Sequence, residues 1–112
     1  MKVADLANTG GFKAIVLPDP ERVISSGYTG DLLSWVMGKA RDTDAWVTIM
    51  SNINVLAVAS LSDVPCVIFA EGVIPDKEIV NAAQQKQINL ISSEKSAFEI
   101  CAIVHNLISL DL

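Results

Sequence analysis

Polar residues directly follow the apolar runs of this chain, which are its candidate β-strands. Residues 51–54 (SNIN) follow the run 46–50, and residues 92–96 (SSEKS) follow the run 88–91. A third polar segment, residues 25–31 (SSGYTGD), leads into a helical pattern. Ligands of open α/β sheets bind outside the carboxyl ends of the strands, where such loops converge. The predicted ligand-binding residues are Gly27, Tyr28, Asp31, Asn52, Asn54, Ser93 and Ser96.

These residue types favour a small anionic ligand. Serine and asparagine side chains are neutral hydrogen-bond donors, and the free amides at helix starts also attract anions. Tyr28 adds a ring that can stack on a planar ligand. The alternative interpretation is structural: residues 25–31 form a turn before a helix, and Ser93 caps the last helix.

No catalytic constellation accompanies these loops. His105 is the only histidine and lies in an apolar helical run; catalysis would require a nucleophile or an orienting acid within reach, and the acid nearest in sequence, Asp111, is close to the terminus. We therefore expect His105 on a helix surface or at an interface. The glycines form neither a phosphate loop nor a dinucleotide fingerprint. The sequence predicts no catalytic residue, no metal site and no cofactor.

The two cysteines are predicted to be reduced residues of the core. Cys66 and Cys101 both lie in apolar runs, and their spacing matches no zinc or redox motif. Unpaired cysteines are among the most frequently buried residues.

Hydrophobic periodicity predicts alternating strands and helices. Strands are expected over 12–17, 22–25, 45–50, 66–70 and 88–91, and helices over 2–8, 31–40, 54–61, 75–85 and 95–108. The valine-rich segment 54–61 leaves a strand as an alternative. From residue 45 onward the alternation favours right-handed crossovers and parallel pairing. The predicted fold is a single α/β domain, residues 1–112, with a mainly parallel central sheet flanked by helices.

Composition favours self-association. Of the 112 residues, 51% are hydrophobic and only 19% are charged, which leaves little polar material for the surface. The last helix is apolar nearly all round, with Phe98, Cys101, Val104 and Ile108 on one face. A helix of this kind is usually buried on more than one side. We therefore expect a dimer or larger assembly, with an interface built from Ile100, Ile103 and Leu107 and extended by Trp35.

Charge and hydropathy exclude several partner classes. The net charge of −5 and the scattered basic residues argue against nucleic acid and against an anionic membrane surface. No apolar stretch approaches the length that spans a bilayer. The first residues, MKVADLANTGG, lack the apolar segment of a signal peptide. The expected location is the cytoplasm.

Three segments together resemble a DRTGG domain. They are GYTGDLLSWVM, WVTIMSNINVLAVASL and VIFAEGVIPDKEIVNAAQQKQINLISSEKSAFEIC, and the likeness runs from Val3 to Leu107. The matching patches are Gly27, Asp31, Asn54 and residues 96–99. The family's naming run, Asp-Arg-Thr-Gly-Gly, is absent, and Ile53 stands about where a basic residue is common.

The resemblance implies an α/β accessory domain without catalytic activity, similar to the N-terminal domain of HPr kinase/phosphorylase. Related stand-alone forms occur in anaerobic bacteria, which implies a link to hydrogenase or redox metabolism. The leading hypothesis is a homo-oligomeric regulatory module that senses a small anionic metabolite or nucleotide, or docks a partner protein. The alternatives are a purely structural assembly protein and a small phosphoryl-transfer enzyme, which would need a phosphate cradle and a positioned base.

Overall fold

A five-stranded sheet forms the centre of the computed structural model, which describes residues 1–110. The strands are β1 (Lys13–Val16), β2 (Ser26–Thr29), β3 (Asp44–Thr48), β4 (Cys66–Phe69) and β5 (Leu90–Ser92). Their order across the sheet is β1-β5-β4-β3-β2. Strands β2 to β5 are parallel, and β1 pairs antiparallel with β5. The predicted α/β fold with a mainly parallel sheet is confirmed.

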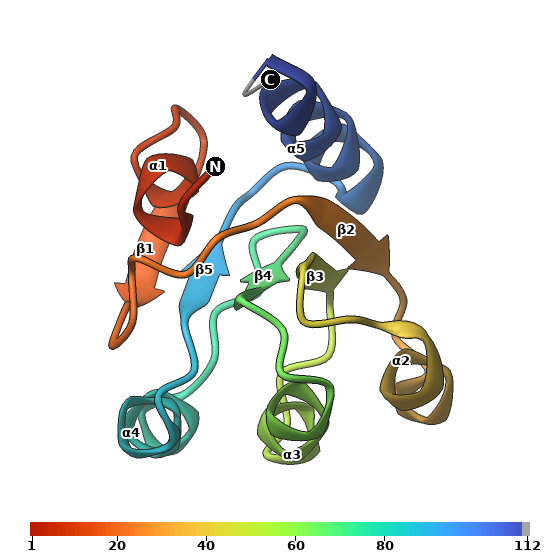
Figure 1. Ribbon diagram of the computed structural model, residues 1–112. Helices are drawn as coiled ribbons and strands as arrows, with labels where there is room; N and C mark the ends of the chain where they lie inside the picture. Colours follow the sequence, from red (N-terminus) through yellow and green to blue (C-terminus); the bar gives the residue numbers. More distant parts are fainter. Residues whose placement is uncertain (111–112) are drawn as a thin grey trace.

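Five helices cover the two faces of this sheet (Figure 1). They are α1 (Val3–Ala7), α2 (Leu33–Lys39), α3 (Asn54–Ser62), α4 (Lys77–Lys86) and α5 (Ala97–Leu110). Helices α2, α3 and α4 lie on one face, and α1 and α5 lie on the other. Each helix of the first group connects neighbouring parallel strands, so the three crossovers have the same hand and reach the same face.

The core has one half on each face of the sheet. On the α2–α4 side, Trp46, Phe69 and Leu90 are fully buried among residues of the three helices. On the α1–α5 side, Ile68 and Ile91 pack with residues of those two helices. All residues of β3, β4 and β5 are buried. Strands that are covered on both faces read as continuous apolar runs, and this is why the sequence revealed them.

Side-chain hydrogen bonds cap helix α4 and connect segments that are distant in the sequence. Asp76 caps α4 by accepting a hydrogen bond from the amide of Ile79 at 3.1 Å. The buried Asn89 side chain donates to the carbonyl oxygens of Asp19 and Pro65, at 2.7 and 2.9 Å, and accepts from the Asp19 amide at 3.0 Å. Asn89 therefore fixes the loop after β1 to the start of β4.

The predicted strand over residues 22–25 is wrong. Val23 forms only an isolated bridge with Lys2, and the amide of Ile24 donates to the Met1 carbonyl at 2.7 Å. The strand that joins the sheet lies further along, at Ser26–Thr29. Val23 and Ile24 made the earlier segment resemble a strand, but this segment pairs with the beginning of the chain instead. The helix predicted over 54–61 is confirmed, and the strand alternative for it is excluded.

The orientation of α5 also differs from the prediction. Ile100 is fully buried in the core, so it cannot belong to the predicted interface. Phe98 is expected on the buried face of the helix, but its side chain is 84% exposed. Trp35 is exposed, as its place in the predicted self-association interface requires. Ile103 and Leu107 are half-buried. A helix with apolar residues all round does not show by its sequence which side meets the sheet.

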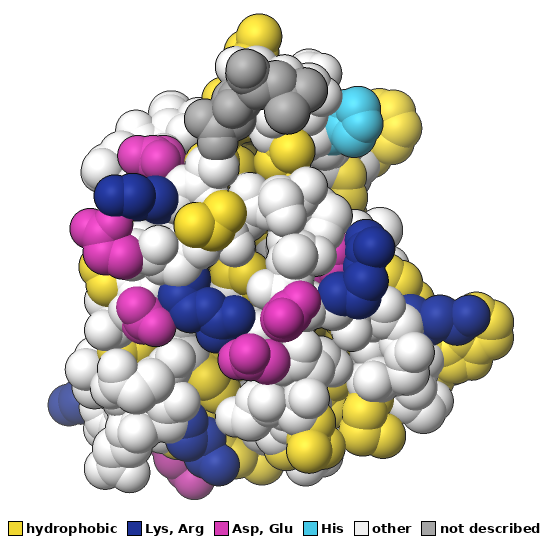
Figure 2. Space-filling model, in the orientation of Figure 1, with side chains coloured by type: hydrophobic (Ala, Val, Ile, Leu, Met, Phe, Trp, Pro, Cys, Tyr) yellow, Lys and Arg dark blue, Asp and Glu magenta, His cyan; other side chains and the backbone are white. Residues whose placement is uncertain are grey.

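Surface charges are mixed on the face shown in Figure 2, where acidic and basic side chains alternate. Two ion pairs connect distant segments: Arg22 binds Asp63 at 3.0 Å, and Lys2 binds Glu21 at 2.6 Å. Within residues 1–110, no helix has both the length and the hydropathy that crossing a membrane requires.

Candidate ligand-binding site

The chain changes faces between β4 and β5. The connection that leaves β4 leads to α4 on one face, whereas the connection that leaves the neighbouring β5 leads to α5 on the other (Figure 1). Loops that part toward opposite faces leave a crevice at the carboxyl ends of the two strands. This position is therefore the topological switch point of the sheet.

A small pocket of about 220 Å³ lies at this switch point. It is lined by Gly11, Phe12, Lys13, Gly72, Ile74, Ser92, Ser93 and Glu94. The lining comes from the start of β1, the loop after β4 and the loop after β5. It therefore combines backbone groups, serine side chains, the Lys13 ammonium and the Glu94 carboxylate in a space that suits a single small polar group.

Hydrogen bonds hold the loops around this pocket in place. Ser93 donates its hydroxyl to the Gly11 carbonyl at 2.7 Å and accepts from the Lys95 amide at 3.1 Å. The amides of Gly72 and Glu71 donate to the carbonyls of Ser93 and Lys95, both at 2.9 Å. Ser93 is buried, so the predicted site residue is present at the switch point but its hydroxyl is engaged in these bonds.

Left-handed backbone conformations shape two of these loops. Gly11 has φ +89°, and a Cβ there would lie 2.5 Å from Cε of Lys95. Gly72 has φ +75°, and the preceding Glu71 has φ 60°. A non-glycine residue in this region is uncommon and stays there only where its surroundings hold it. The bonds from the amides of Glu71 and Gly72 supply that restraint.

Ser96, not Ser93, caps α5. The Ser96 hydroxyl accepts from the Glu99 amide at 3.2 Å, and Glu99 Oε1 accepts from the Ser96 amide at 3.3 Å. This reciprocal pair is a capping box. The prediction of Ser93 as the cap is wrong, because α5 begins at Ala97 and its cap is the residue directly before.

Gly27 and Tyr28 lie inside β2 rather than in a loop after a strand. Their register partners in β3 are Ala45 and Trp46. The Tyr28 ring packs against the core half on the α2–α4 side, with Cε2 at 3.3 Å from a Cβ placed on Gly30. The prediction that Tyr28 lines the crevice at the carboxyl ends of the strands is therefore wrong.

Asp31 connects the end of β2 to the end of β3. Its Oδ1 accepts hydrogen bonds from the Thr48 hydroxyl at 2.7 Å and from the Ile49 amide at 2.9 Å. The adjacent Gly30 carbonyl accepts from the indole of Trp46 at 2.9 Å. These bonds occupy the carboxylate in a structural role.

Asn52 and Asn54 lie at the start of α3. Asn52 Oδ1 accepts from the Asn54 amide at 2.9 Å, which forms a local turn that leads into the helix. Both residues are exposed. Their position follows β3, as predicted, and the Asn54 side chain extends into solvent rather than into the core.

The seven predicted residues therefore form separate groups along the sheet edge. Ser93 and Ser96 follow β5, Asn52 and Asn54 follow β3, and Asp31 follows β2. Strands β4 and β3 lie between β5 and β2. At about 4.8 Å per strand, the loops after β5 and β2 are on the order of 14 Å apart. A small ligand at the switch point does not reach Asp31.

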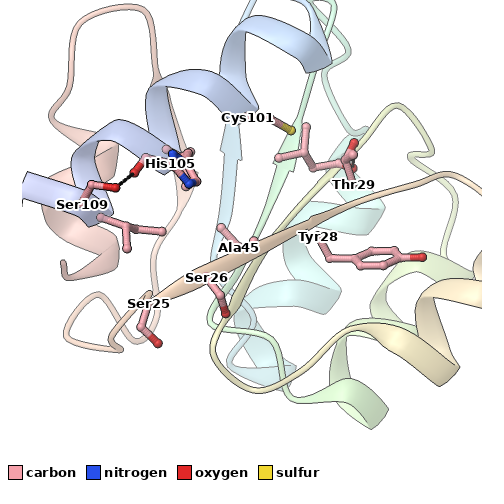
Figure 3. A pocket seen from close by; sticks show the side chains of 12 residues that line it. Ser25, Ser26, Tyr28, Thr29, Ala45, Cys101, His105 and Ser109 are labelled. Carbon is pink, nitrogen blue, oxygen red and sulfur yellow. Dashed lines mark hydrogen bonds between the residues drawn. The ribbon is translucent and has the colours of Figure 1, made fainter.

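A larger groove that the sequence did not predict runs between β2 and α5 (Figure 3). Its volume is about 480 Å³, and its floor includes Gly27, Ala45 and Val47. Cys101 and His105 of α5 lie on its wall, and the Tyr28 ring points away from it. Gly27 and Ala45 are small residues at paired positions of β2 and β3, but in the sequence such a pair is only a weak indication of a groove. The groove exists because α5 lies across these two strands.

The titratable groups near the groove form no catalytic arrangement. His105 is exposed, and Ser109 donates to its backbone carbonyl at 2.9 Å rather than to its ring. Burial raises the pKa of the Cys66 thiol to about 12, and Arg22 only partly offsets this rise. Cys66 belongs to the core as predicted, whereas Cys101 is half-buried. Within the described residues, no group of three or more His, Cys, Asp or Glu is placed to hold a metal ion.

Residues 51–108 match the family model described as HPr Serine kinase N terminus. The search of curated proteins found no match. The fold is similar to the CBS and DRTGG domains of the regulatory region of a Clostridium perfringens pyrophosphatase, solved with its activator diadenosine tetraphosphate.

That structural match has a TM-score of 0.66 at 16% sequence identity, and it covers 91% of this chain and 48% of the other. The present chain thus spans about half the length of that regulatory region. The two matches confirm the resemblance to DRTGG domains that the sequence showed.

Proposed function

Because the chain belongs to the family of HPr serine kinase N-terminal domains, we propose that it is a non-catalytic regulatory module that binds a small anionic ligand. The observation that carries this proposal is the pocket of about 220 Å³ at the β4–β5 switch point. A cytoplasmic location and self-association are part of the same proposal. So is the link to the redox metabolism of anaerobes, which rests on the resemblance alone.

The chemistry of the pocket supports an anionic group as its occupant. The side chain of Lys13 supplies a positive charge to the pocket and backbone groups of the loop after β5 also line it, whereas the Glu94 carboxylate requires that an anion bind on the Lys13 side. The volume is below the range of about 300–1,000 Å³ that is usual for complete ligands. We infer that the pocket holds one phosphate or carboxylate group and that the rest of the ligand extends outward.

The predicted contacts from other loops follow from this geometry. Ser93 lines the pocket and Ser96 follows it in the same loop, and a ligand as long as a nucleotide would cross the end of β4 toward Asn52 and Asn54. The exposed side chains of these two asparagines therefore stay predicted contacts. An enzymatic function is disfavoured because no hydrogen bond within residues 1–110 joins the His105 ring to an acid, and because the buried Cys66 thiol is held protonated by its raised pKa.

A thermal-shift screen with nucleotides, phosphorylated metabolites and inorganic phosphate tests the proposal. A ligand at one hundred times its dissociation constant stabilises the folded state by about 2.7 kcal/mol. We expect Lys13→Ala to weaken the binding of a screened anion about tenfold, since hydrogen bonds to charged groups contribute about 1.5–3 kcal/mol. Lys86→Ala, at the end of α4 on the far face, is the matched control and should bind normally. Equal binding by both variants would contradict this site.

A further inference from the structure

The outer edge of β2 is an unpaired row of backbone groups. The amides of Ser26 and Gly30 donate to the carbonyls of Thr43 and Val47, at 3.0 and 3.2 Å, on the β3 side. Alternate residues of a strand direct their backbone groups to opposite edges. Gly27 and Thr29 therefore direct their N–H and C=O groups away from β3, and both residues are exposed.

Nothing in β2 protects this edge. Native edge strands usually carry a lysine, a proline or a bulge that discourages pairing with another chain. The sequence of β2 is SGYT, and its pairing with β3 shows a regular register from Ser26 to Thr29. An edge of this kind is suited to accept one more strand.

The groove described above runs directly beside this edge. Gly27 leaves its floor open, because a Cβ at that position would have only the Ala45 carbonyl oxygen within contact distance, at 3.5 Å. On the opposite wall, Val104 and Ile108 of α5 supply apolar surface. A strand of another protein chain that pairs with this edge would thus bring apolar side chains of that chain next to the groove.

The same helix carries a group that fits such a groove. The Phe98 side chain is 84% exposed, although it is large and apolar. It lies two helical turns before His105, on the stripe of α5 that borders the groove. Ile108 lies ten residues beyond Phe98, which is about 15 Å along a helix. Phe98 and the far end of the groove at Ile108 are therefore separated along one surface, so a twofold rotation can bring each Phe98 toward the groove of the other copy.

The distribution of charge favours a second copy of this chain as the occupant. The chain has a net charge of −5, so two copies repel one another over most of their surface. Among residues 1–110, those that line the groove include no Asp, Glu, Lys or Arg. On the other side of the same edge, Leu32 and Trp35 before and within α2 are 62% and 61% exposed. Two copies can meet here without opposing like charges, and the exposed apolar side chains become covered.

We propose that two copies of this chain pair through antiparallel β2 edges and that Phe98 of each copy packs into the groove of the other. Gly27 of one copy then lies opposite Thr29 of the second, and the two sheets become one. This inference gives a surface to the self-association proposed above and rests on it. The small pocket at the β4–β5 switch point stays open in the dimer, because it lies at the other side of the sheet.

Sedimentation velocity of the full 112-residue chain and two edge variants tests this inference. We expect a dimer for the wild type at micromolar concentration, and at least a tenfold rise in the dimer dissociation constant for Phe98→Asp. Gly27→Pro should have the same effect, since it removes an amide that points away from β3. Leu61→Asp, an exposed apolar position on α3 at 73% exposure, is the matched control and should leave the dimer intact.

The outcomes separate the two proposals. A wild-type dimer that Phe98→Asp and Gly27→Pro leave unchanged would overturn this interface while self-association stands. A monomeric wild type would overturn both, and the ligand screen would still test the pocket independently. Circular dichroism and thermal melting establish that each variant is folded, and Phe98→Asp alone decides the question if Gly27→Pro does not fold, because Phe98 is exposed.

Discussion

Replacing Asp31 with alanine should destabilise the protein, because it removes the acceptor for the buried Thr48 hydroxyl at the end of β3. In the folded chain Asp31 Oδ1 accepts from the Thr48 hydroxyl at 2.7 Å and from the Ile49 amide at 2.9 Å. Thr48 is 1% exposed, so water cannot replace the lost acceptor at its hydroxyl. Ile49 is 46% exposed, so its amide can bond to solvent instead. The cost therefore comes mainly from Thr48.

An unsatisfied buried donor costs about 1–3 kcal/mol, so we expect Asp31→Ala to lower the free energy of unfolding by about 2 kcal/mol. At about 4–8 °C per kcal/mol, the melting temperature should fall by roughly 10 °C. Asp31→Asn keeps an acceptor oxygen at the same place and is the matched control, with a loss of less than about 1 kcal/mol. Urea unfolding followed by circular dichroism measures all of these values.

A double-mutant cycle with Thr48→Val isolates the bond between the two side chains. If the bond carries the effect, Asp31→Ala costs less in the Thr48→Val background than in the wild type, with a coupling of about 1 kcal/mol. A strictly additive cycle, or an Asp31→Ala variant as stable as the wild type, would refute the structural role of this carboxylate. Asp31 would then be free to serve a ligand, as the sequence predicted.

Four further expectations follow from buried or capped groups. A thiol reagent should modify the half-buried Cys101 in the folded protein and reach Cys66 only on unfolding. Because burial raises the pKa of Cys66 to about 12, the unfolded chain loses this proton first as the pH rises. The stability that Cys66 contributes should decline from about pH 9 to 12, and Cys66→Ala should flatten that part of the profile in pH-dependent urea titrations. Ser96→Ala should cost about 1 kcal/mol in the same assay, whereas Ser96→Asp should keep the cap toward Glu99. Asn89→Leu should cost at least about 2 kcal/mol, because it leaves several backbone groups without their partner; a loss below about 0.5 kcal/mol would contradict that role.

The sequence predicted best those elements that are buried on both faces. Strands β3 and β4 read as continuous apolar runs because helices cover both of their sides. Strand β2 has one unpaired edge and the mixed sequence SGYT, so it carried no such run, and the apolar pair Val23 and Ile24 drew the prediction toward the wrong segment. An edge strand depends on its neighbour for its position, and that neighbour lies further along the chain.

Features of the site were predictable only where residues close together in the sequence determine them. The box formed by Ser96 and Glu99 is a four-residue pattern, and the serine-to-glutamate spacing distinguishes Ser96 from Ser93 as the cap. The role of Ser93 could not be read in this way, because its partner is the carbonyl of Gly11 near the other end of the chain. The groove likewise depends on where α5 crosses the sheet, and this is decided by packing between distant segments.

The antiparallel pairing of Lys13 with Ser92 joins the first strand of the sheet to the last one. A ribosome releases the chain from its N-terminus, so β1 emerges well before its partner β5, which follows β2, β3 and β4 in the chain. Strands β2, β3 and β4 can meanwhile pair in order, each with the next, through α2 and α3. Val3 and Leu6 of α1 belong to the same core half as Ile100 and Val104 of α5, so this half of the core is complete only when α5 has packed on the sheet. A nascent chain stopped before α5 would thus expose apolar residues on this face of its sheet, and we expect chaperone binding to end when α5 packs there.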